Sequence, residues 1–295
     1  MLLDGKRIAD QIQDEMRQQI EKRQLHTLDR PPCLAVLIVG NHPASEIYVK
    51  RKTEACAAVG IQSIRRQFPS TISAQELLHQ IDLLNADSEV DGILLQLPIP
   101  GHISPVQMMH AIHPDKDIDG FHPVNIGKLL IGEKDGFIPC TPLGIQTLMD
   151  RSQIEVAGKD ALIVGRSNIV GKPMAALLMQ SGPGGDATVT VAHRHSKDLP
   201  ELCRRADILI VAIGQPGFIR GSMVKEGAVV IDVGINKVPD PAKKMGYRIQ
   251  GDVNFEEVAP KCSWITPVPK GVGPMTIAML LQNTLTSYER NLLKK

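Results

Sequence analysis

Short apolar runs of strand length recur along the whole sequence, and segments with helical periodicity follow them. Strands buried on both faces read as continuous apolar runs, which is typical of parallel sheets covered by helices. The alternation therefore predicts an α/β fold. The expected strands are 33–39, 61–68, 91–97, 161–165, 187–193, 207–213 and 228–234, and the expected helices are 4–24, 43–60, 73–86, 142–151, 171–181, 197–206 and 274–291.

The alternation is interrupted once, over residues 113–142, which are rich in Pro, Gly and Asp. This texture predicts long functional loops and a connection between two α/β units. A chain of 295 residues can bury two such cores. We therefore expect a first domain over residues 1–140 and a second over residues 141–273.

Composition excludes several classes of protein. A net charge of +1 and 3% aromatic residues give no basic stripe and few stacking platforms, so neither nucleic acid nor a membrane surface is an expected partner. The five cysteines are scattered, which favours reduced thiols over disulfides or a zinc site. The first residues form an amphipathic pattern without a signal-peptide core, and no stretch reads as a membrane span, so the expected location is the cytoplasm.

The turn after the strand 161–165 has features of a dinucleotide site. Gly165, Arg166 and Ser167 open it, and a helix with Pro in its first turn follows. A helix N-terminus in this position favours a phosphate group. Because serine replaces the second glycine of the usual G-x-G-x-x-G pattern, a purely structural tight turn is the alternative.

The end of the next strand indicates which cofactor is bound. NAD sites place an acidic residue there to hold the ribose 2′-hydroxyl, whereas this chain has His193, Arg194, His195 and Ser196. A guanidinium and a hydroxyl suit a 2′-phosphate, so we expect NADP. The alternative is that Arg194 is an ordinary surface cation. The two histidines lack a metal-binding pattern.

Three consecutive cations follow Tyr48 in the helix expected over residues 43–60. At 100° per residue, Lys52 shares the apolar face with Tyr48, one turn away. Lys50 points to the opposite side and Arg51 flanks it. A lysine held against an apolar wall can relay protons, although Lys52 could instead extend its ammonium past the apolar face into solvent.

Two further polar side chains are candidates for the same site. Gln96 lies near the carboxyl end of a buried strand, where ligands bind in open α/β sheets. Asp119 stands directly before Gly120 on a loop and could face a cleft, whereas Asp115 suits the solvated surface. The spacing of these acids imitates a calcium loop, but Ile126 occupies the position of the required glutamate, so no metal site is expected.

Seven sequence motifs are spread along the chain from the first helix to the last. They are Y-x-x-x-K at 48–52, "DGILLQLPIP", "PDKDIDGFHPVN", "PCTPLGI", "VGRSNIVGKPM", "VVIDVGIN" and "ITPVPKGVGPMT". Together they resemble the bifunctional methylenetetrahydrofolate dehydrogenase/methenyltetrahydrofolate cyclohydrolase family. The resemblance implies NADP-dependent oxidation of 5,10-methylenetetrahydrofolate, followed by hydrolysis of the methenyl cation to 10-formyltetrahydrofolate.

The resemblance also implies roles for residues of the first domain. Lys52 matches the catalytic lysine, and Gln96 matches the glutamine bonded to it. Tyr48 matches the tyrosine that packs along the folate, and Asp119 matches the acid that grips the pterin. Hydride transfer needs orientation more than a protein acid or base, while the hydrolysis needs proton transfers of the kind a lysine can provide.

The remaining implications concern the cofactor and the assembly. Gly165, Arg166, Ser167 and Ile235 match positions that contact NADP. The family is similar in forming a cytosolic homodimer, with an active-site cleft between two α/β domains, the second of them Rossmann-like. A C-terminal helix, here 274–295, completes the first domain.

One position departs from the family pattern. Pro269 and Lys270 match folate-binding positions, but the family usually has two glycines after T-P-V-P, and Lys270 occupies the first. If this residue needs a positive φ or a close approach to folate, lysine is unfavourable there. Alternatively, its ammonium could contact the glutamate carboxylates of the substrate.

Two rival interpretations remain. Y-x-x-x-K also marks short-chain dehydrogenases, but there the glycine-rich turn precedes the Tyr–Lys pair, and here the order is reversed. A nucleotide-sensing binding protein would need the Rossmann-like half, but it gives no reason for Lys52 on an apolar face. Formation of NADPH with methylenetetrahydrofolate would decide between them.

Overall fold

The computed structural model describes the backbone of residues 1–27, 30–41, 43–243 and 245–293, without the side chains of 25–27 and 43–48. The chain divides into two compact units. The first unit comprises Asp10–Cys140 and Ile277–Lys295, and the second comprises Met1–Ala9 and Thr141–Thr276. In the described part of the chain, no helix has both the length and the apolar character to span a membrane.

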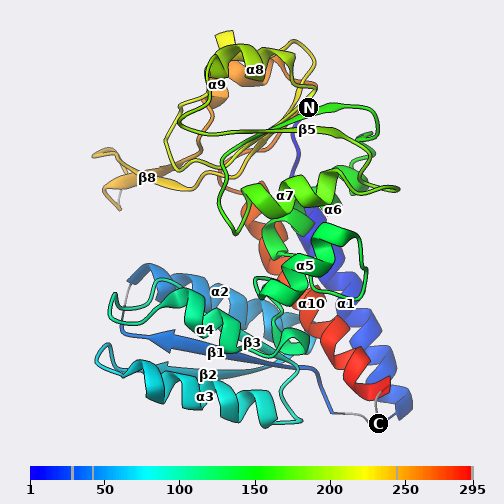
Figure 1. The fold of residues 1–295 in the computed structure, drawn as a ribbon, viewed down its shortest axis with the longest axis vertical. Coiled ribbons are helices and arrows are strands. Elements are labelled where there is room, and N and C mark those ends of the chain that lie inside the picture. The colour runs from blue at the N-terminus through cyan, green and yellow to red at the C-terminus, as the bar shows by residue number, and fades with distance from the viewer. Residues whose placement is uncertain (28–29, 42, 244, 294–295) are drawn as a thin grey trace. The chain divides into compact units, whose positions relative to one another are not determined.

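The first unit is built on a three-stranded parallel sheet in the order β2-β1-β3. These strands span Gln62–Phe68 (β2), Cys33–Val39 (β1) and Gly92–Leu95 (β3). Every residue of β1 is buried, which is why its sequence is continuously apolar. Figure 1 shows α2 (Pro43–Val59) and α3 (Ala74–Ala86) on opposite sides of this sheet.

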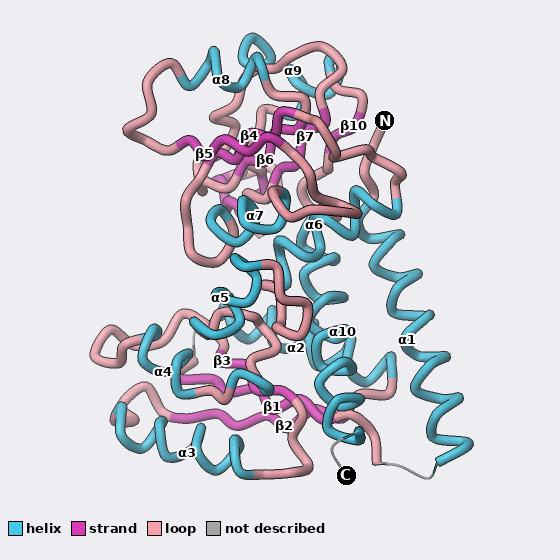
Figure 2. Tube along the Cα trace, turned by 45° about the vertical axis from the view of Figure 1, so that its right-hand side comes forward, coloured by secondary structure: helices cyan, strands magenta, loops and turns pink. Residues whose placement is uncertain are grey.

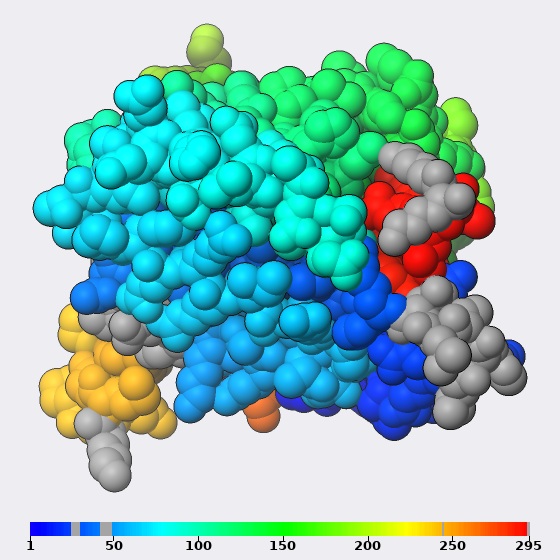
Figure 3. Space-filling view, turned by 90° about the horizontal axis from the view of Figure 1, so that it is seen from below, coloured from blue at the N-terminus to red at the C-terminus, as the bar shows by residue number. Residues whose placement is uncertain are grey.

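Helix α3 shows how sequence and packing agree in this unit. The Ser73 side chain accepts a hydrogen bond from the backbone N–H of Glu76, and the backbone N–H of Ser73 donates to the Glu76 carboxylate. This capping box fixes the start of the helix. Leu77, Ile81 and Leu84 form the buried face. Burying each such side chain contributes about 1.5–3 kcal/mol. The opposite, polar face of α3 lies on the molecular surface (cyan in Figure 3).

The prediction of loops over residues 113–142 is wrong in part. After α4 (Pro105–Ala111) and a 3-10 turn at Pro114–Lys116, the chain forms α5 (Pro123–Ile131). His122 caps this helix, Pro123 opens it, and Gly132 ends it with φ +83°. Proline and glycine therefore delimit a helix here, as N1 proline and C-terminal glycine commonly do. The two long helices are α1 (Gly5–Thr27) and α10 (Val272–Leu293).

The second unit contains a five-stranded parallel sheet in the order β10-β7-β6-β4-β5. Helices α8 (Leu199–Arg205) and α9 (Phe255–Val258) lie on one side, and α6 (Cys140–Arg151) and α7 (Gly171–Leu178) lie on the other (Figure 2). The strands span Asp160–Val164 (β4), Thr188–Ala192 (β5), Ile208–Val211 (β6), Val229–Asp232 (β7) and Trp264–Ile265 (β10).

The strand order of the second unit has a switch point between β4 and β6. The chain leaves β4 to form β5 on one side and later returns to form β6 on the other. Ligands of open α/β sheets bind at the carboxyl ends of the strands at such a switch point. All seven predicted strands are present, but the antiparallel pair β8 (Asn236–Pro239) and β9 (Tyr247–Gln250) was not predicted.

Candidate active site and cofactor site

The helical-face prediction for α2 is confirmed for the described side chains. The Lys50 side chain is 76% exposed, and Arg51 is also exposed. Lys52 is half-buried on the same face as the buried Cys56 and Val59. The helix ends at Val59, as expected. The side chain of Tyr48 lies outside the described residues.

Lys52 is held inward by Gln96. Its Nζ donates to Gln96 Oε1 at 3.2 Å, so the ammonium is directed to the end of β3. The amide of Gln96 is itself oriented, because its Nε2 donates to the carbonyl of Leu97 at 2.6 Å. The backbone N–H of Gln96 continues the sheet pairing to Leu37. The glutamine predicted to need a hydrogen-bond partner inside an apolar run therefore has one.

Asp119 is electrostatically coupled to the same lysine. It is half-buried in the loop that follows the 3-10 turn. The pKa of its carboxyl group is raised, chiefly by burial. The charge of Lys52 and the neighbouring thiol of Cys140 act in the opposite direction. The structure thus brings Lys52, Gln96 and Asp119 together from three separate segments.

Two residues that the sequence interpretation missed fix the backbone beside Asp119. Asn283 of α10 donates through Nδ2 to the carbonyl of Ile118 at 2.8 Å and to that of Ile138 at 3.1 Å. The thiol of Cys140 donates to the same Ile118 carbonyl at 3.2 Å. These hydrogen bonds to the Ile118 carbonyl hold the backbone directly before Asp119 in place. Cys140 lies in a quoted motif, whereas nothing local marks Asn283.

Asp117 organises the same loop from inside the core. Its carboxylate, 2% exposed, accepts hydrogen bonds from the N–H groups of Phe121 and His122 and from the side chain of Asn125. Burial is the main reason that the pKa of Asp117 is raised to about 7. The sequence interpretation gave Asp117 no role. Asp115, expected on the surface, is exposed.

The turn after β4 is built for close backbone approach. Gly165 has φ +129°, and a Cβ there would lie 2.3 Å from the carbonyl oxygen of Ala212. At Gly171 a Cβ would lie 2.2 Å from the carbonyl oxygen of Gly165. Both positions therefore require glycine. Ser167 Oγ accepts from the N–H groups of residues 170 and 171, which leaves the exposed loop 166–169 as the part open to a ligand.

Arg194 follows β5, the strand beside β4, and is exposed. The short turn that carries it is closed by a hydrogen bond from the N–H of His193 to Ser196 Oγ at 3.0 Å. The backbone N–H of Gly165 donates to Ala192 at the end of β5, so the two turns adjoin. An exposed arginine beside a glycine turn at parallel strand ends fits a dinucleotide with an additional phosphate.

The remaining predicted residues also occur in loops of the second unit. Ile235, three residues after the end of β7, is 50% exposed. Pro269 and Lys270 are exposed. Lys270 adopts φ +86°, so the backbone reason for a glycine at this position is present, and lysine is strained there. Contact with a substrate tail stays a prediction.

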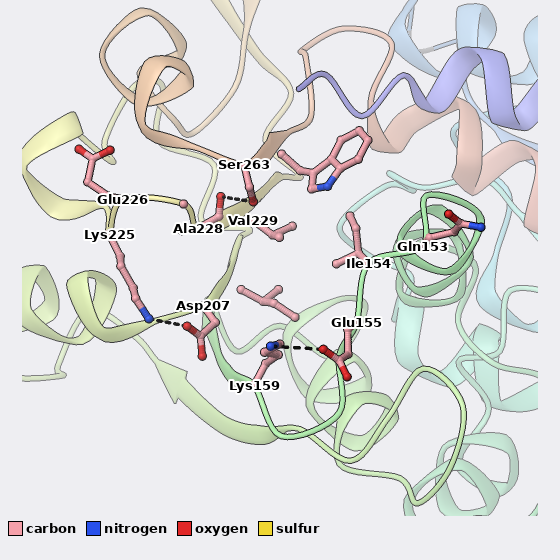
Figure 4. A pocket seen from close by; sticks show the side chains of 13 residues that line it. Gln153, Ile154, Glu155, Lys159, Asp207, Lys225, Glu226, Ala228, Val229 and Ser263 are labelled. Carbon is pink, nitrogen blue, oxygen red and sulfur yellow. Dashed lines mark hydrogen bonds and ion pairs between the residues drawn. The ribbon is translucent and has the colours of Figure 1, made fainter.

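A cavity of about 340 Å³ lies at the opposite end of the second sheet (Figure 4). Its lining includes Asp207, which precedes β6, and Trp264, which begins β10. Lys225 pairs with Asp207 at its rim. Because this cavity is at the amino ends of the strands, it is not where an open α/β sheet binds its cofactor.

Fold and site together define a class: an α/β dinucleotide-dependent enzyme that carries, in a separate unit, a lysine-centred site suited to proton transfer. Comparison with known proteins specifies the family. Residues 3–119 match the model of the tetrahydrofolate dehydrogenase/cyclohydrolase catalytic domain. Residues 139–292 match the model of the NAD(P)-binding domain of the same family.

Individual relatives agree with this result. The bifunctional protein FolD of Protochlamydia amoebophila is 64% identical over 291 residues, covering 99% of this chain and 98% of the relative. The FolD crystal structure from Campylobacter jejuni has a TM-score of 0.92 at 48% identity, covering 98% of this chain and 99% of that one. The Trypanosoma brucei FolD structure, complexed with NADP cofactor and inhibitor, has a TM-score of 0.93 at 39% identity, covering 99% and 98%.

The chain belongs to the tetrahydrofolate dehydrogenase/cyclohydrolase family. The family expected from the seven motifs is thereby confirmed, together with the two-domain α/β class, the paired dehydrogenase and cyclohydrolase activities and the NADP cofactor. This result excludes both rival interpretations, the short-chain dehydrogenase and the nucleotide-sensing binding protein.

Proposed function

We propose that Lys52 is the proton-transfer group of a bifunctional enzyme of one-carbon metabolism. The enzyme oxidises 5,10-methylenetetrahydrofolate with NADP and hydrolyses the methenyl product to 10-formyltetrahydrofolate. The observation that carries the assignment to Lys52 is its 3.2 Å hydrogen bond to Gln96 on a half-buried helix face. Lys50 and Arg51 on the same helix are exposed and lack this placement.

The hydrolysis needs two proton movements. Water adds to the methenyl carbon and loses a proton, and the ring nitrogen that leaves this carbon gains one. Lys52 has three N–H positions, of which one is used on Gln96. No hydrogen bond of the other two is present among the described side chains, and we propose that they exchange protons with the attacking water and the leaving nitrogen. Gln96, oriented by Leu97, keeps the lysine in reach of both.

Substrate recognition is assigned to residues around this lysine. Asp119 is proposed to hold the pterin, because a carboxylate can accept two N–H bonds from its amidine-like edge. Tyr48, one turn before Lys52, is proposed to pack along the folate. Pro269 and Lys270 are proposed to contact the substrate as well. These roles rest on motif positions and, for Asp119, on its coupling to Lys52.

Cofactor binding is assigned to the carboxyl ends of the second sheet. Gly165, Arg166 and Ser167 are proposed to receive the phosphates and Arg194 the 2′-phosphate. Ile235 is proposed to contact the cofactor as well. Bound NADP supplies the hydride acceptor. The supporting observations are the glycine-dependent turn after β4 and the exposed arginine after the adjoining β5. The protein's part in the hydride step is orientation.

The domain roles and the assembly follow the same reasoning. We infer that residues 1–140 with 274–295 form the catalytic domain and that residues 141–273 form the NADP-binding domain. We also infer that the chain is a cytoplasmic homodimer, as the resemblance implies. Light scattering of the purified protein tests the dimer, because a monomer mass would overturn it.

Two assays on one preparation test the proposed function. NADPH formation from methylenetetrahydrofolate reports the dehydrogenase, and loss of methenyltetrahydrofolate in the absence of NADP reports the cyclohydrolase. Wild-type protein is expected to perform both. Absence of either reaction would overturn the bifunctional assignment.

A further inference from the structure

Two buried carboxylates lie at the carboxyl end of the second sheet. Asp232 ends β7 and is 4% exposed, and Asp252 follows β9 and is fully buried. Burying a charge is costly unless hydrogen bonds replace its hydration. Among the described residues, backbone N–H groups donate hydrogen bonds to both acids, and one side-chain amide donates to Asp252.

Asp252 fixes the segment that follows β6. Its Oδ2 accepts hydrogen bonds from the N–H groups of Ile213 at 2.7 Å and Gly214 at 2.9 Å. Its Oδ1 accepts from the amide of Asn236, the first residue of β8, at 2.8 Å. One side chain thus holds the loop after β6 to the segment after β7.

Asp232 fixes the segment that follows its own strand. Its Oδ1 accepts from the N–H of Gly234 at 3.0 Å and from the N–H of Asp252 at 2.9 Å. Its Oδ2 accepts from the N–H of Val253 at 3.0 Å. Burial raises the pKa of Asp232 to about 6, below neutral pH, so it remains ionised and both oxygens stay acceptors. A Cβ at Gly251 would lie 1.8 Å from Oδ2, so the approach is close on that side too.

The segments held by the two acids adjoin the proposed cofactor contacts. Gly165 packs against the carbonyl of Ala212, the residue before Ile213. Ile235 lies between Gly234 and Asn236, which are held by Asp232 and Asp252 respectively. Both acids are buried, so their hydrogen bonds hold backbone and are not open to a ligand.

We propose that Asp232 and Asp252 act together as positioning residues for NADP, holding the loops after β6 and β7 so that the Gly165 turn and Ile235 present the cofactor correctly. This inference rests on the proposed cofactor site. Hydrolysis of methenyltetrahydrofolate needs no NADP. Loss of a positioning residue should therefore weaken NADP binding and spare hydrolysis, whereas a general loss of stability would lower both activities.

Asp232→Asn is the sharpest variant. All three partners of Asp232 are backbone N–H donors, so an asparagine must turn its NH₂ group against at least one of them. We expect the KM for NADP to rise about tenfold or more, and hydrolysis measured without NADP to stay within about twofold of wild type. An unchanged KM for NADP would overturn the proposal.

Asp252→Asn is a milder second variant, and we expect it to fold. The amide of Asn236 can rotate so that its oxygen accepts from the new NH₂ group, and one carbonyl oxygen still serves Ile213 and Gly214. We expect a KM increase for NADP of about threefold, smaller than for Asp232→Asn. If Asp232→Asn does not fold, this variant decides: no increase, or an equal loss of both activities, overturns the proposal.

Asp207→Asn is the matched control. Asp207 precedes β6 at its other end, where it accepts from the N–H of Asp160 at 3.0 Å and pairs with Lys225 (Figure 4). This carboxylate also holds a backbone N–H group of the second unit, but it does not contact the carboxyl-end loops. We expect no change in the KM for NADP, and an increase equal to that of Asp232→Asn would overturn the proposal. Wild-type protein without dehydrogenase activity would instead mean that the proposed function fails.

Discussion

The carboxyl ends of the two sheets are constructed differently. In the first unit, polar and ionisable side chains meet each other: Lys52 donates a hydrogen bond to the Gln96 amide, and its charge acts on Asp119. In the second unit, the exposed loop 166–169 follows the close-packed glycine turn at Gly165. Arg194 is exposed in the adjoining turn, and the carboxylates of Asp232 and Asp252 are buried beneath.

The difference reflects two kinds of chemistry. Proton transfer depends on the electrostatic surroundings of a few side chains, so these must be partly withdrawn from water and paired. Binding a charged cofactor depends on backbone donors and arginines that a large ligand can reach. Changes in one unit should therefore affect one activity more than the other.

Removing the lysine amine should have the largest effect. Lys52→Met keeps most of the stem but deletes the group bonded to Gln96. We expect cyclohydrolase activity to fall by about 10²-fold or more, the usual scale for loss of a general acid–base group. Dehydrogenase activity should fall less, because hydride transfer requires no proton from the protein. Steady-state assays of both activities measure this, and Lys50→Met, on the exposed face, should leave both near wild type.

Removing the arginine after β5 should have the next largest effect, confined to the cofactor. Charge-assisted hydrogen bonds contribute roughly 1.5–3 kcal/mol, so Arg194→Ala should raise the KM for NADP by about 10- to 100-fold. The KM for NAD should change little, because NAD lacks the 2′-phosphate. Lys197→Ala removes an exposed cation three residues away and serves as control. An equal loss for NAD and NADP would contradict the assignment.

Asn283→Leu tests whether the backbone beside Asp119 matters for folate. The change leaves the Ile118 and Ile138 carbonyls without the amide donor. Losing a buried partner costs about 1–3 kcal/mol, so the free energy of unfolding should fall by this amount. The KM for folate should rise in both reactions, while the KM for NADP stays unchanged. Asn291 lies on the same helix as Asn283 and donates to Asp91. Asn291→Leu removes that hydrogen bond and should leave the KM for folate unchanged.

The buried acid of the first unit should make stability depend on pH. The pKa of Asp117 is about 7 when folded, above its unfolded value. As pH falls from about 7 towards 4, the folded state binds a proton that the unfolded state does not. The free energy of unfolding therefore rises, by at most about 1.4 kcal/mol per pH unit for this group. Denaturant unfolding of Asp117→Asn should show a smaller rise than wild type. Identical pH profiles would contradict the raised pKa.

The smallest effect is expected at Lys270. Because Lys270 adopts φ +86°, Lys270→Gly should relieve about 1 kcal/mol of strain and raise Tm by roughly 2–4 °C. If the ammonium also contacts the glutamate tail, the KM for polyglutamylated folate should rise more than that for the monoglutamate. A lower Tm would contradict the strain, and equal KM changes would remove the tail contact.

Sequence periodicity could predict what a single element determines. The side of α2 on which Lys52 lies follows from 3.6 residues per turn. Strands such as the fully buried β1 follow from continuous apolar runs, whereas β2 contains two arginines and is partly exposed. Residues 123–131 were misassigned because their proline and glycine delimit a helix instead of a loop. The Asn283–Ile118 bond joins residues 165 positions apart, so no local pattern reveals it. The Asp232–Asp252 pair is hidden for the same reason.

The most direct test of the contrast between the two units is one experiment with two readouts. Lys52→Met and Arg194→Ala are assayed in parallel for NADPH formation at subsaturating NADP and for methenyltetrahydrofolate hydrolysis without NADP. We predict that Lys52→Met loses chiefly hydrolysis and that Arg194→Ala loses chiefly NADPH formation. If both variants lose both activities in the same proportion, the assignment of proton transfer to one unit and cofactor recognition to the other is wrong.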